Sequence, residues 1–392
     1  MDKKLYNLTN PQKSILLTEE YYKGTNINNI CGTAIIENEL DFELLKKAVC
    51  IVAKNHDSFN LKLTVENNEI KQYLSDFKDI DVEIIDIDSK DDISKIENDL
   101  MNHVFDIYSG DLFCFKIFRF KDNTGGFMLN IHHLFADSWT LGVTAKDIVR
   151  VYSCLLNRNE IIQNNDFSYV KYIYSEKEYI NSDKFVKDKE YWKSIFKTLP
   201  EQASIPSSVS NSIDNFSCSA NRKTFNIDKS LMDKINEFCK INRVSVFNFF
   251  MGLYAIYISR VSGLDDFVIG TPILNRTTFN EKNTTGMFIN TAPLRISIDD
   301  NLDFKSFVSN IAKDSLGMLR HQKYYYQNIL ADLRKDYPNL PNLYNILISY
   351  QVTKANTEEG LNYTTRWAFN GNTSDDIDIH LSDLNCSGSL DI

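Results

Sequence analysis

The sequence predicts a mixed α/β protein built from two lobes. The chain has 392 residues, which is too long for one ordinary hydrophobic core. Apolar residues make up 43% and charged residues 24% of the chain, the balance typical of globular proteins. Segments in which apolar residues alternate as in strands follow and precede segments in which they have helical spacing. This succession of strand and helix patterns indicates an α/β fold.

The first part of the chain supplies most of the strand patterns. Pro11 suits the first turn of a helix over 11–22, and Asp41 suits the N-cap of a helix over 41–54. A further helix is expected over 91–104. Strands are expected over 31–37, 59–65, 70–74, 112–120 and 127–133, with hairpin turns around residues 66–68 and 122–126.

The second part of the chain carries more helical patterns. A helix is expected over 138–156, and one or two surface helices are expected over 167–196. Residues 203–220 are rich in Ser and Asn and predict a long connection. Helices then follow over 229–242, 245–261 and 304–319, and strands over 266–271, 292–298, 344–351 and from 363 onward. The apolar stretch 246–261 contains polar residues and is too short to span a bilayer, so we interpret it as a buried core helix.

Charge and cysteine content narrow the class of partner and the compartment. The net charge is −10, which argues against nucleic acid because phosphate binding needs a basic face. The seven cysteines are scattered without a CxxC pair, a pattern typical of free thiols in a reducing compartment. The N-terminus has no apolar signal region. We therefore expect a cytoplasmic protein with no membrane partner.

The candidate chemistry lies in nine residues, His132-His133-Leu134-Phe135-Ala136-Asp137-Ser138-Trp139-Thr140. Histidine exchanges protons near neutral pH, and two of the chain's six histidines are neighbours here. Strand alternation places adjacent side chains on opposite faces, so the pair cannot readily chelate one metal, and no other His/Cys cluster has ligand spacing. Either both histidines are structural, or one is packed and the other works at a cavity with Asp137 as its orienter.

The motif HHLFADSWT resembles the HHxxxDGWS signature of condensation domains from nonribosomal peptide synthetases, in the chloramphenicol acetyltransferase superfamily. Other segments resemble that family in the same order along about 340 residues. They are NPQKSIL at 10–16, NHDSF at 55–59 (similar to RHExLR), DFVIGTP at 266–272 with Arg276, GMFINT at 286–291 with Arg295, His321-Gln322, and Ser349-Tyr350-Gln351.

Details of the motif separate variants within that family. Cyclization domains replace the two histidines with aspartates, and epimerization domains place Ser-Trp at three and four residues past the Asp. Here Trp139 and Thr140 come at two and three residues past Asp137, as in condensation domains. The chain departs from the family at Ser138, where the family has Gly, and in the arginines missing from the 55–59 segment. It also ends before the family's last helix, which suggests a fragment.

The resemblance implies a fold of two chloramphenicol acetyltransferase-like lobes, a V-shaped pseudo-dimer with a central tunnel, expected at 1–175 and 176–392. It implies His133 as the catalytic residue and His132, Asp137, Ser138 and Trp139 as structural motif residues. It also implies that Asp137 pairs with Arg276; an N-cap role for Asp137 is the alternative, and the two can coexist. Candidate tunnel residues are Asn290, Ser349 and Gln351.

The reaction implied is amide formation by aminolysis of a thioester. Donor and acceptor are expected on the phosphopantetheine arms of partner peptidyl carrier proteins, within a synthetase that also contains adenylation domains. The chain itself is expected to bind no cofactor and no metal. Two alternatives stay open: an acyltransferase of the same superfamily that uses coenzyme A thioesters without a carrier, and a non-catalytic platform that recruits carriers or tailoring enzymes.

Overall fold

The computed structural model describes residues 3–163, 166–205, 217–352, 356–358, 360–383 and 388–392. The chain forms two compact units. The first contains Met1–Glu178, Arg276–Phe288 and Lys354–Asn372, and the second contains Tyr179–Asn275, Ile289–Thr353 and Thr373–Ile392. The first unit thus takes up two segments that lie beyond the boundary expected near residue 175.

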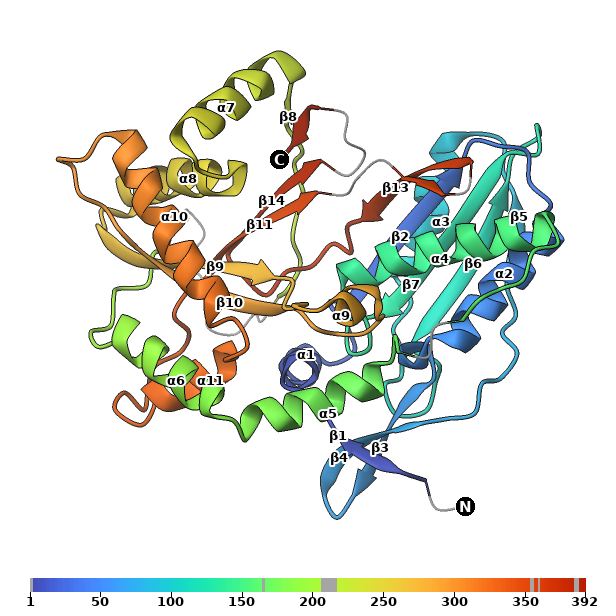
Figure 1. Ribbon diagram of the computed structural model, residues 1–392, viewed down its shortest axis with the longest axis horizontal. Coiled ribbons are helices and arrows are strands. Elements are labelled where there is room, and N and C mark those ends of the chain that lie inside the picture. Colours follow the sequence, from blue (N-terminus) through green and yellow to red (C-terminus); the bar gives the residue numbers. More distant parts are fainter. Residues whose placement is uncertain (1–2, 164–165, 206–216, 353–355, 359, 384–387) are drawn as a thin grey trace. The chain divides into compact units, whose positions relative to one another are not determined.

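The first unit is built on a six-stranded sheet with the order β12-β13-β2-β7-β6-β5. All its neighbouring pairs are antiparallel except β5 with β6. Figure 1 shows β2, β7 and β6 side by side. Its strands are β2 (Asn29–Ile36), β5 (Glu83–Asp86), β6 (Phe113–Arg119), β7 (Gly125–His132), β12 (Asn356–Glu358) and β13 (Leu361–Ala368).

Helices cover both faces of this sheet. On one face, α2 (Phe42–Asn55) and α4 (Ser138–Leu156) pack on alternate residues of β7, among them Phe127, Leu129 and Ile131. On the other face, α3 (Lys90–Met101) packs against Met128. The two faces of β7 therefore separate as strand alternation predicts. The predicted N-cap of α2 is confirmed, because the Leu44 N–H donates to the Asp41 carboxylate at 3.0 Å.

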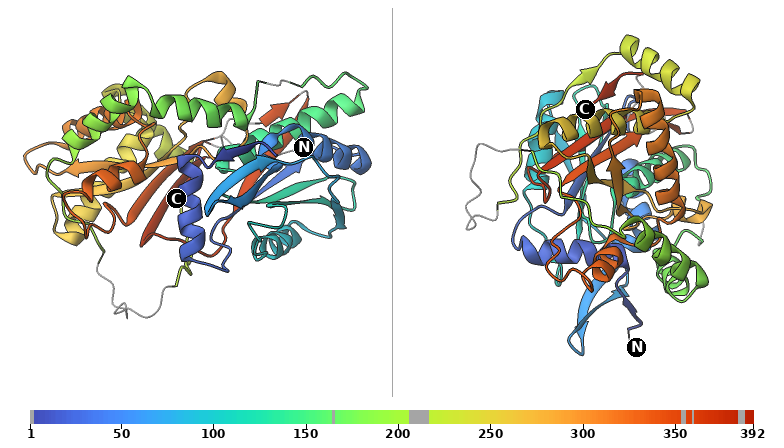
Figure 2. Two further views of the ribbon diagram at one scale, coloured as in Figure 1. Left: turned by 90° about the horizontal axis from the view of Figure 1, so that it is seen from below. Right: turned by 90° about the vertical axis from the view of Figure 1, so that its left-hand side faces the viewer.

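A smaller sheet completes the first unit together with its remaining helices. The strands β1 (Leu5–Asn7), β4 (Glu69–Leu74) and β3 (Leu61–Glu66) pair in that order, and the β3–β4 hairpin lies near the N-terminus in Figure 2. The other helices are α1 (Asn10–Tyr21), α5 (Tyr169–Ile180), which continues into the second unit, and the short α9 (Phe279–Asn283). A single 3-10 turn, Asp57–Phe59, precedes β3.

The second unit is built on another six-stranded sheet, with the order β10-β9-β11-β14-β15-β8. Its central strands β9, β11 and β14 are parallel. The strands are β8 (Asn226–Ile227), β9 (Asp266–Ile273), β10 (Asn290–Ser297), β11 (Ile346–Val352), β14 (Ile377–Asp383) and β15 (Leu390–Asp391). The helices are α6 (Asp183–Ile195), α7 (Lys229–Asn242), α8 (Val246–Ser262), α10 (Phe304–Arg320) and α11 (Tyr326–Leu333).

The fold class predicted from the sequence, mixed α/β, is confirmed. The helix expected over 138–156 is α4, and the helix expected over 229–242 is α7. The apolar stretch 246–261 forms α8 and contributes to the core of the second unit. Residues 206–216 of the expected 203–220 connection lie outside the described residues.

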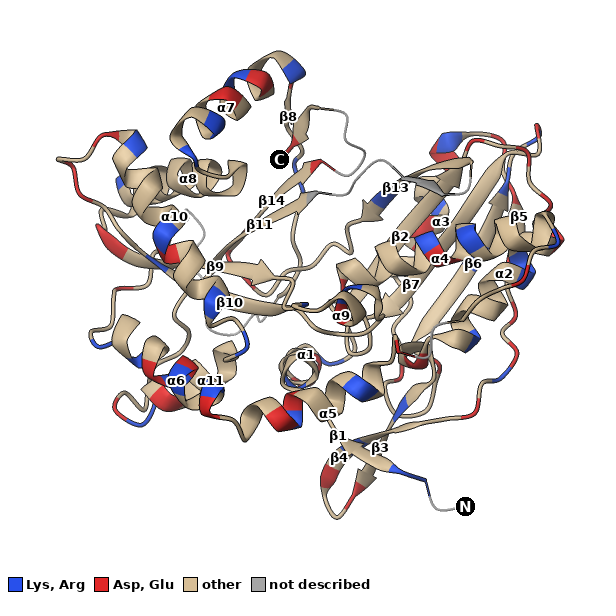
Figure 3. Cartoon of the chain, in the orientation of Figure 1, with Lys and Arg blue, Asp and Glu red and all other residues tan. Residues whose placement is uncertain are grey.

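Charged residues are unevenly distributed among the helices and strands. Figure 3 shows many charged residues along helices such as α6 and α7, whereas β7 carries none. No single helix within the described residues is long and apolar enough to cross a membrane; α7 and α8, bent by 101°, reach that length and composition only as a pair.

Candidate active site

The two histidines lie where β7 gives way to α4. Every residue of β7 is buried, and three backbone hydrogen bonds hold the turn that follows. The His132 N–H donates to the Leu112 carbonyl at 2.8 Å, the His133 N–H to the Asn28 carbonyl at 2.7 Å, and the Phe135 N–H to the His132 carbonyl at 3.2 Å. The turn is therefore tied to the strands beside it as well as to itself.

His132 is a buried side chain with both ring nitrogens occupied. Its Nδ1 accepts a hydrogen bond from the Leu134 N–H at 3.1 Å, and its Nε2 lies 3.2 Å from a carboxylate oxygen of Glu19. Only 2% of the residue is exposed. A ring held at both nitrogens has none left for a substrate, so this geometry suits a scaffolding role.

His133 follows the last residue of β7 and is half-buried. Its Nδ1 is enclosed and has no hydrogen-bond partner within the described part of the chain. Burial lowers the pKa of His133, while the Asp137 charge and the carbonyl groups of His133 and Ala136 act in the opposite direction. The half-buried ring is therefore neutral at pH 7.

Asp137 is the most densely bonded carboxylate of the site. It caps α4 through the Thr140 N–H at 2.9 Å and the Thr140 hydroxyl at 3.0 Å. It also accepts hydrogen bonds from Arg276 at 2.5 and 3.0 Å and from the Phe288 N–H at 3.0 Å. His133 is not among these donors. Asp137 thus acts as N-cap and as ion-pair partner at once, and it reaches His133 only through its charge.

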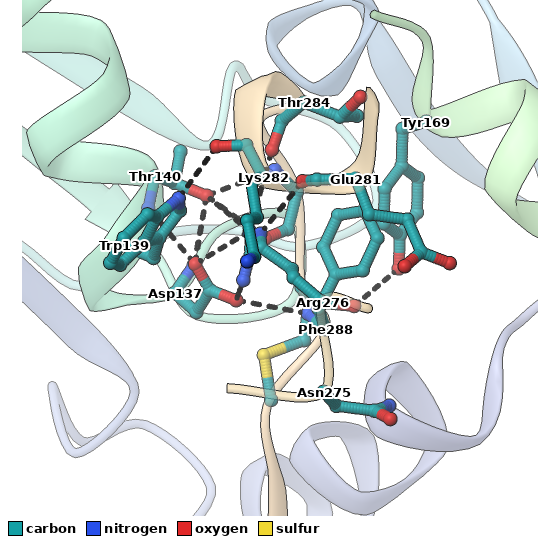
Figure 4. Close-up of polar contacts among 12 residues, drawn as sticks. Asp137, Trp139, Thr140, Tyr169, Asn275, Arg276, Glu281, Lys282, Thr284 and Phe288 are labelled. Atoms are coloured by element: carbon teal, nitrogen blue, oxygen red, sulfur yellow. Dashed lines mark hydrogen bonds and ion pairs between the residues drawn. The ribbon is translucent and has the colours of Figure 1, made fainter. Parts of the chain in front are cut away.

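Arg276 is fully enclosed beside Asp137, and both side chains are 0% exposed. The guanidinium donates to the carbonyls of Glu281 and Gly286, each at 3.1 Å, and lies over the Phe288 ring with 4.0 Å to the ring centroid. Figure 4 shows these contacts around the guanidinium. The planar fork of arginine suits such a bidentate carboxylate pair. The segment 276–288 is therefore anchored in the first unit.

Ser138 and Trp139 open α4 next to the ion pair. Ser138 is the first residue of a regular helix, a position where a serine fits without strain although the family has glycine there. Trp139 is 38% exposed, and its Nε1–H donates to the Lys282 carbonyl at 2.8 Å, as Figure 4 shows. Trp139 thereby fastens the start of α4 to α9.

Thr140 and Gly286 are two site residues to which sequence reasoning assigned no role. The Thr140 hydroxyl accepts a hydrogen bond from the Gly286 N–H at 2.9 Å, and its oxygen also lies 2.9 Å from the Gly286 carbonyl oxygen. Gly286 has φ +145°, and a Cβ there would lie 2.1 Å from Cδ2 of Tyr169. Only glycine fits both constraints. The signal for Thr140 was its place three residues after Asp137, where it completes a capping box.

The 55–59 segment, which lacks the arginines of the RHExLR pattern, makes polar contacts with α4 and α5. His56 Nε2 lies 2.9 Å from the Asp147 carboxylate. Asp57 accepts hydrogen bonds from the Tyr169 N–H at 2.9 Å and the Val170 N–H at 3.1 Å, at the start of α5. His56 and Asp57, which match the histidine and the acid of the RHExLR pattern, therefore both make polar contacts with other segments of the first unit.

The three candidate tunnel residues all lie in the second unit. Asn290 is buried, and its side chain donates to the Gln322 carbonyl at 2.9 Å and accepts from the Tyr326 N–H at 3.3 Å. Ser349 is buried, with its Oγ 2.7 Å from Nδ1 of His380. Gln351 is half-buried near the end of β11. Asn290 thus fixes a loop through both polar atoms.

Within the described ranges, no group of three or more His, Cys, Asp or Glu side chains lies close enough together to hold a metal ion. The six cysteines in those ranges are free thiols.

Comparisons with known proteins agree with this arrangement. Surfactin synthase subunit 1 of Bacillus subtilis (strain 168) is 33% identical over 401 residues, covering 100% of this chain and 11% of that protein. Tyrocidine synthase 3 of Brevibacillus parabrevis is 22% identical over 375 residues, covering 95% of this chain and 6% of that protein. The chain therefore spans a small part of these relatives.

Solved structures show the same fold. The starter condensation domain of rhizomide synthetase RzmA, in complex with C8-CoA, has a TM-score of 0.86 at 20% identity, covering 99% of this chain and 88% of that one. The first condensation domain of the calcium-dependent antibiotic synthetase has a TM-score of 0.84 at 16% identity, covering 99% and 90%. The sequence profile of the family described as Condensation domain matches residues 2–388. The chain therefore belongs to the condensation-domain family found in nonribosomal peptide synthetases.

Proposed function

We propose that this chain forms an amide bond between a donor acyl or peptidyl thioester and the free amine of an acceptor aminoacyl thioester. The observation that carries the proposal is the neutral, half-buried ring of His133 in a turn that backbone hydrogen bonds anchor on both sides. Family membership supplies the class of reaction. Both substrates would arrive on the phosphopantetheine arms of partner carrier proteins, with adenylation domains loading them.

The proposed step begins when the acceptor amine attacks the thioester carbonyl carbon. A C–N bond forms, and the carbonyl electrons move to oxygen to give a zwitterionic tetrahedral adduct. Nε2 of His133 accepts a proton from the ammonium nitrogen, or holds the amine by a hydrogen bond before attack. The adduct then collapses, the C–S bond breaks, and the thiolate leaves and takes up a proton. Atoms and charge balance without an added oxidant or reductant.

This reaction needs a well-positioned base more than a strong one. A thiol with a pKa of about 8.5 makes a good leaving group, and an amine with a pKa of about 8 is partly neutral at pH 7. A strong base is therefore not required, and alignment of amine and carbonyl becomes the main task. We propose that His132, Asp137 and Arg276 serve that task by fixing the turn.

A coenzyme A thioester is a second candidate donor. The specific observation is the likeness to a starter condensation domain solved with C8-CoA. Such a donor would need the same attack and the same proton transfer at His133. The two donors differ only in what carries the phosphopantetheine arm, so they can be separated by supplying octanoyl-coenzyme A and an octanoyl-loaded carrier in parallel.

The test is a transfer assay with loaded acceptor carriers, followed by intact mass. We expect His133→Ala to slow product formation by about 100- to 10,000-fold, the range of general acid–base assistance, without moving the thermal midpoint. The matched control is His103→Ala, since His103 is exposed and lies after α3. Full activity of His133→Ala would overturn the catalytic assignment. Binding of loaded carriers by the wild-type protein without product would instead favour the non-catalytic platform.

A further inference from the structure

A buried carboxylate lies on the inner side of α1. Glu19 is 8% exposed, whereas its neighbour Glu20 is exposed. Glu19 shares the buried face of α1 with Gln12 and Leu16. Burying a charged group costs free energy unless the group is hydrogen-bonded. The hydrogen-bond partners of the Glu19 carboxylate therefore indicate its role.

The partners of Glu19 lead directly to the histidine turn. Its carboxylate accepts a hydrogen bond from the side-chain amide of Asn28 at 2.7 Å and lies 3.2 Å from Nε2 of His132. Although burial raises the pKa of Glu19, the hydrogen bonds from His132 and Asn28 outweigh it, and the net pKa is lowered. Glu19 is therefore ionised at neutral pH.

The contacts of His132 define its tautomer. Nδ1 accepts the Leu134 N–H at 3.1 Å, so it presents a lone pair and carries no proton. The proton of the neutral ring is then on Nε2, which faces the Glu19 carboxylate. A carboxylate at this point favours that tautomer because it can only accept.

The same carboxylate also reaches the backbone of His133. Asn28, whose side chain is held by Glu19, accepts the His133 N–H through its main-chain carbonyl at 2.7 Å. Glu19 is thus connected to the ring before His133 and, through Asn28, to the amide of His133 itself. All of these contacts lie within the first unit.

We infer that Glu19 is a positioning residue for His133, which it orients by fixing the Nε2–H tautomer of His132 and the carbonyl of Asn28. This inference rests on the proposed function and deepens it. Glu19 touches no reacting atom in this scheme. Its loss should therefore lower kcat, since a misplacement of about 1 Å at a reacting group can cost up to about 100-fold, and should leave KM for either carrier largely unchanged.

The test compares Glu19→Gln with Glu20→Gln in the full chain. The first substitution keeps the shape but removes the charge, and the second removes an exposed charge one residue away. With saturating loaded carriers at a temperature where both proteins are folded, we expect Glu19→Gln to lower kcat by about 10- to 100-fold with KM within about threefold. Glu20→Gln should match wild type. Wild-type kcat in Glu19→Gln, or a loss that appears in KM alone, would overturn the inference.

Nitrogen NMR of ¹⁵N-histidine-labelled protein gives a readout independent of turnover. We expect wild-type His132 to show a protonated Nε2 and an unprotonated Nδ1 at neutral pH. Glu19→Gln should weaken that preference, because its side-chain amide can donate to Nε2 as well as accept from it. The opposite tautomer in the wild type would refute the inference even if Glu19→Gln failed to fold. His133→Ala, assayed in parallel, distinguishes a failure of this inference from a failure of the proposed function. If His133→Ala is slow while Glu19→Gln has wild-type activity, only the role of Glu19 is refuted. If His133→Ala is fully active, the proposed function is refuted.

Discussion

Replacing Asp137 with alanine would leave the guanidinium of Arg276 in the protein interior without its carboxylate. Both side chains are 0% exposed, and the Asp137 oxygens also accept hydrogen bonds from Thr140 and Phe288. Removing one partner of a buried ion pair costs about 3–5 kcal/mol, because the other charge stays buried and unpaired. For a unit of this size that corresponds to a fall in the thermal midpoint of about 6–20 °C.

Urea unfolding followed by far-ultraviolet circular dichroism measures this loss. The matched control is Asp86→Ala, since Asp86 pairs with Arg119 at the surface of the same unit with its side chain 72% exposed. That substitution should barely move the midpoint, because exposed pairs are screened by solvent. The double variant Asp137→Ala/Arg276→Met should recover part of the loss, since it also removes the stranded charge.

Either of two results would show that the Asp137–Arg276 pair does not stabilise the fold in this way. One is an Asp137→Ala protein whose free energy of unfolding lies within about 1 kcal/mol of wild type, the cost of an ordinary substitution. The other is a double variant less stable than Asp137→Ala alone, because the stranded charge of Arg276 would then not be the source of the loss.

Further predictions concern the ring of His133 and two glycines. Burial lowers the pKa of His133 below its ordinary value of 6.5, so the rate should hold through pH 7 and fall only below pH 6.5. Below that pH the unfolded chain binds a proton that the folded protein still excludes, so the free energy of unfolding should also fall as the pH falls. Profiles of rate and of unfolding free energy against pH measure the two effects. His133→Ala should flatten the profile of unfolding free energy. Gly286→Ala should destabilise, since its Cβ would lie 2.1 Å from the Tyr169 ring and φ is +145°. Gly142→Ala, in open space within α4, should instead raise stability by up to about 1 kcal/mol. Thermal midpoints of both variants decide, and equal shifts would contradict the steric argument.

Local signals predicted the elements that carry the site. Asp41 marked the start of α2 and Asn67-Asn68 the β3–β4 turn, where both residues have positive φ, 51° and 63°. These features act over a few residues, so a sequence window contains their whole cause. The short elements β5 and α9 were missed for the opposite reason. Four or five residues carry little periodicity, and such elements persist because other segments pack on them.

The resemblance named one pairing between distant motifs, Asp137 with Arg276, and left another unnamed. Arg295, from the segment that resembles GxFVNTxxxR, donates to Asp266, the first residue of the DxVIGxP-like segment, at 2.8 Å. The antiparallel register of β9 and β10 brings them together. Nothing in either segment alone specifies that register, which depends on which faces of the two strands are buried.

The sequence predicted different surroundings for the two histidines from alternation along one strand, whereas in the structure His132 ends β7 and His133 lies in the turn after it. It also placed Asp137 at a helix start and, through its ordered motifs, indicated the family. It could not show that Glu19 lies against His132, that Thr140 holds Gly286, or that Asp137 has no contact left for His133. Those outcomes depend on hydrogen bonds between residues more than 100 positions apart, and on burial, which many elements create together. Desolvation decides both the protonation of His133 and the strength of the Asp137–Arg276 pair, and it exists only once the chain has folded.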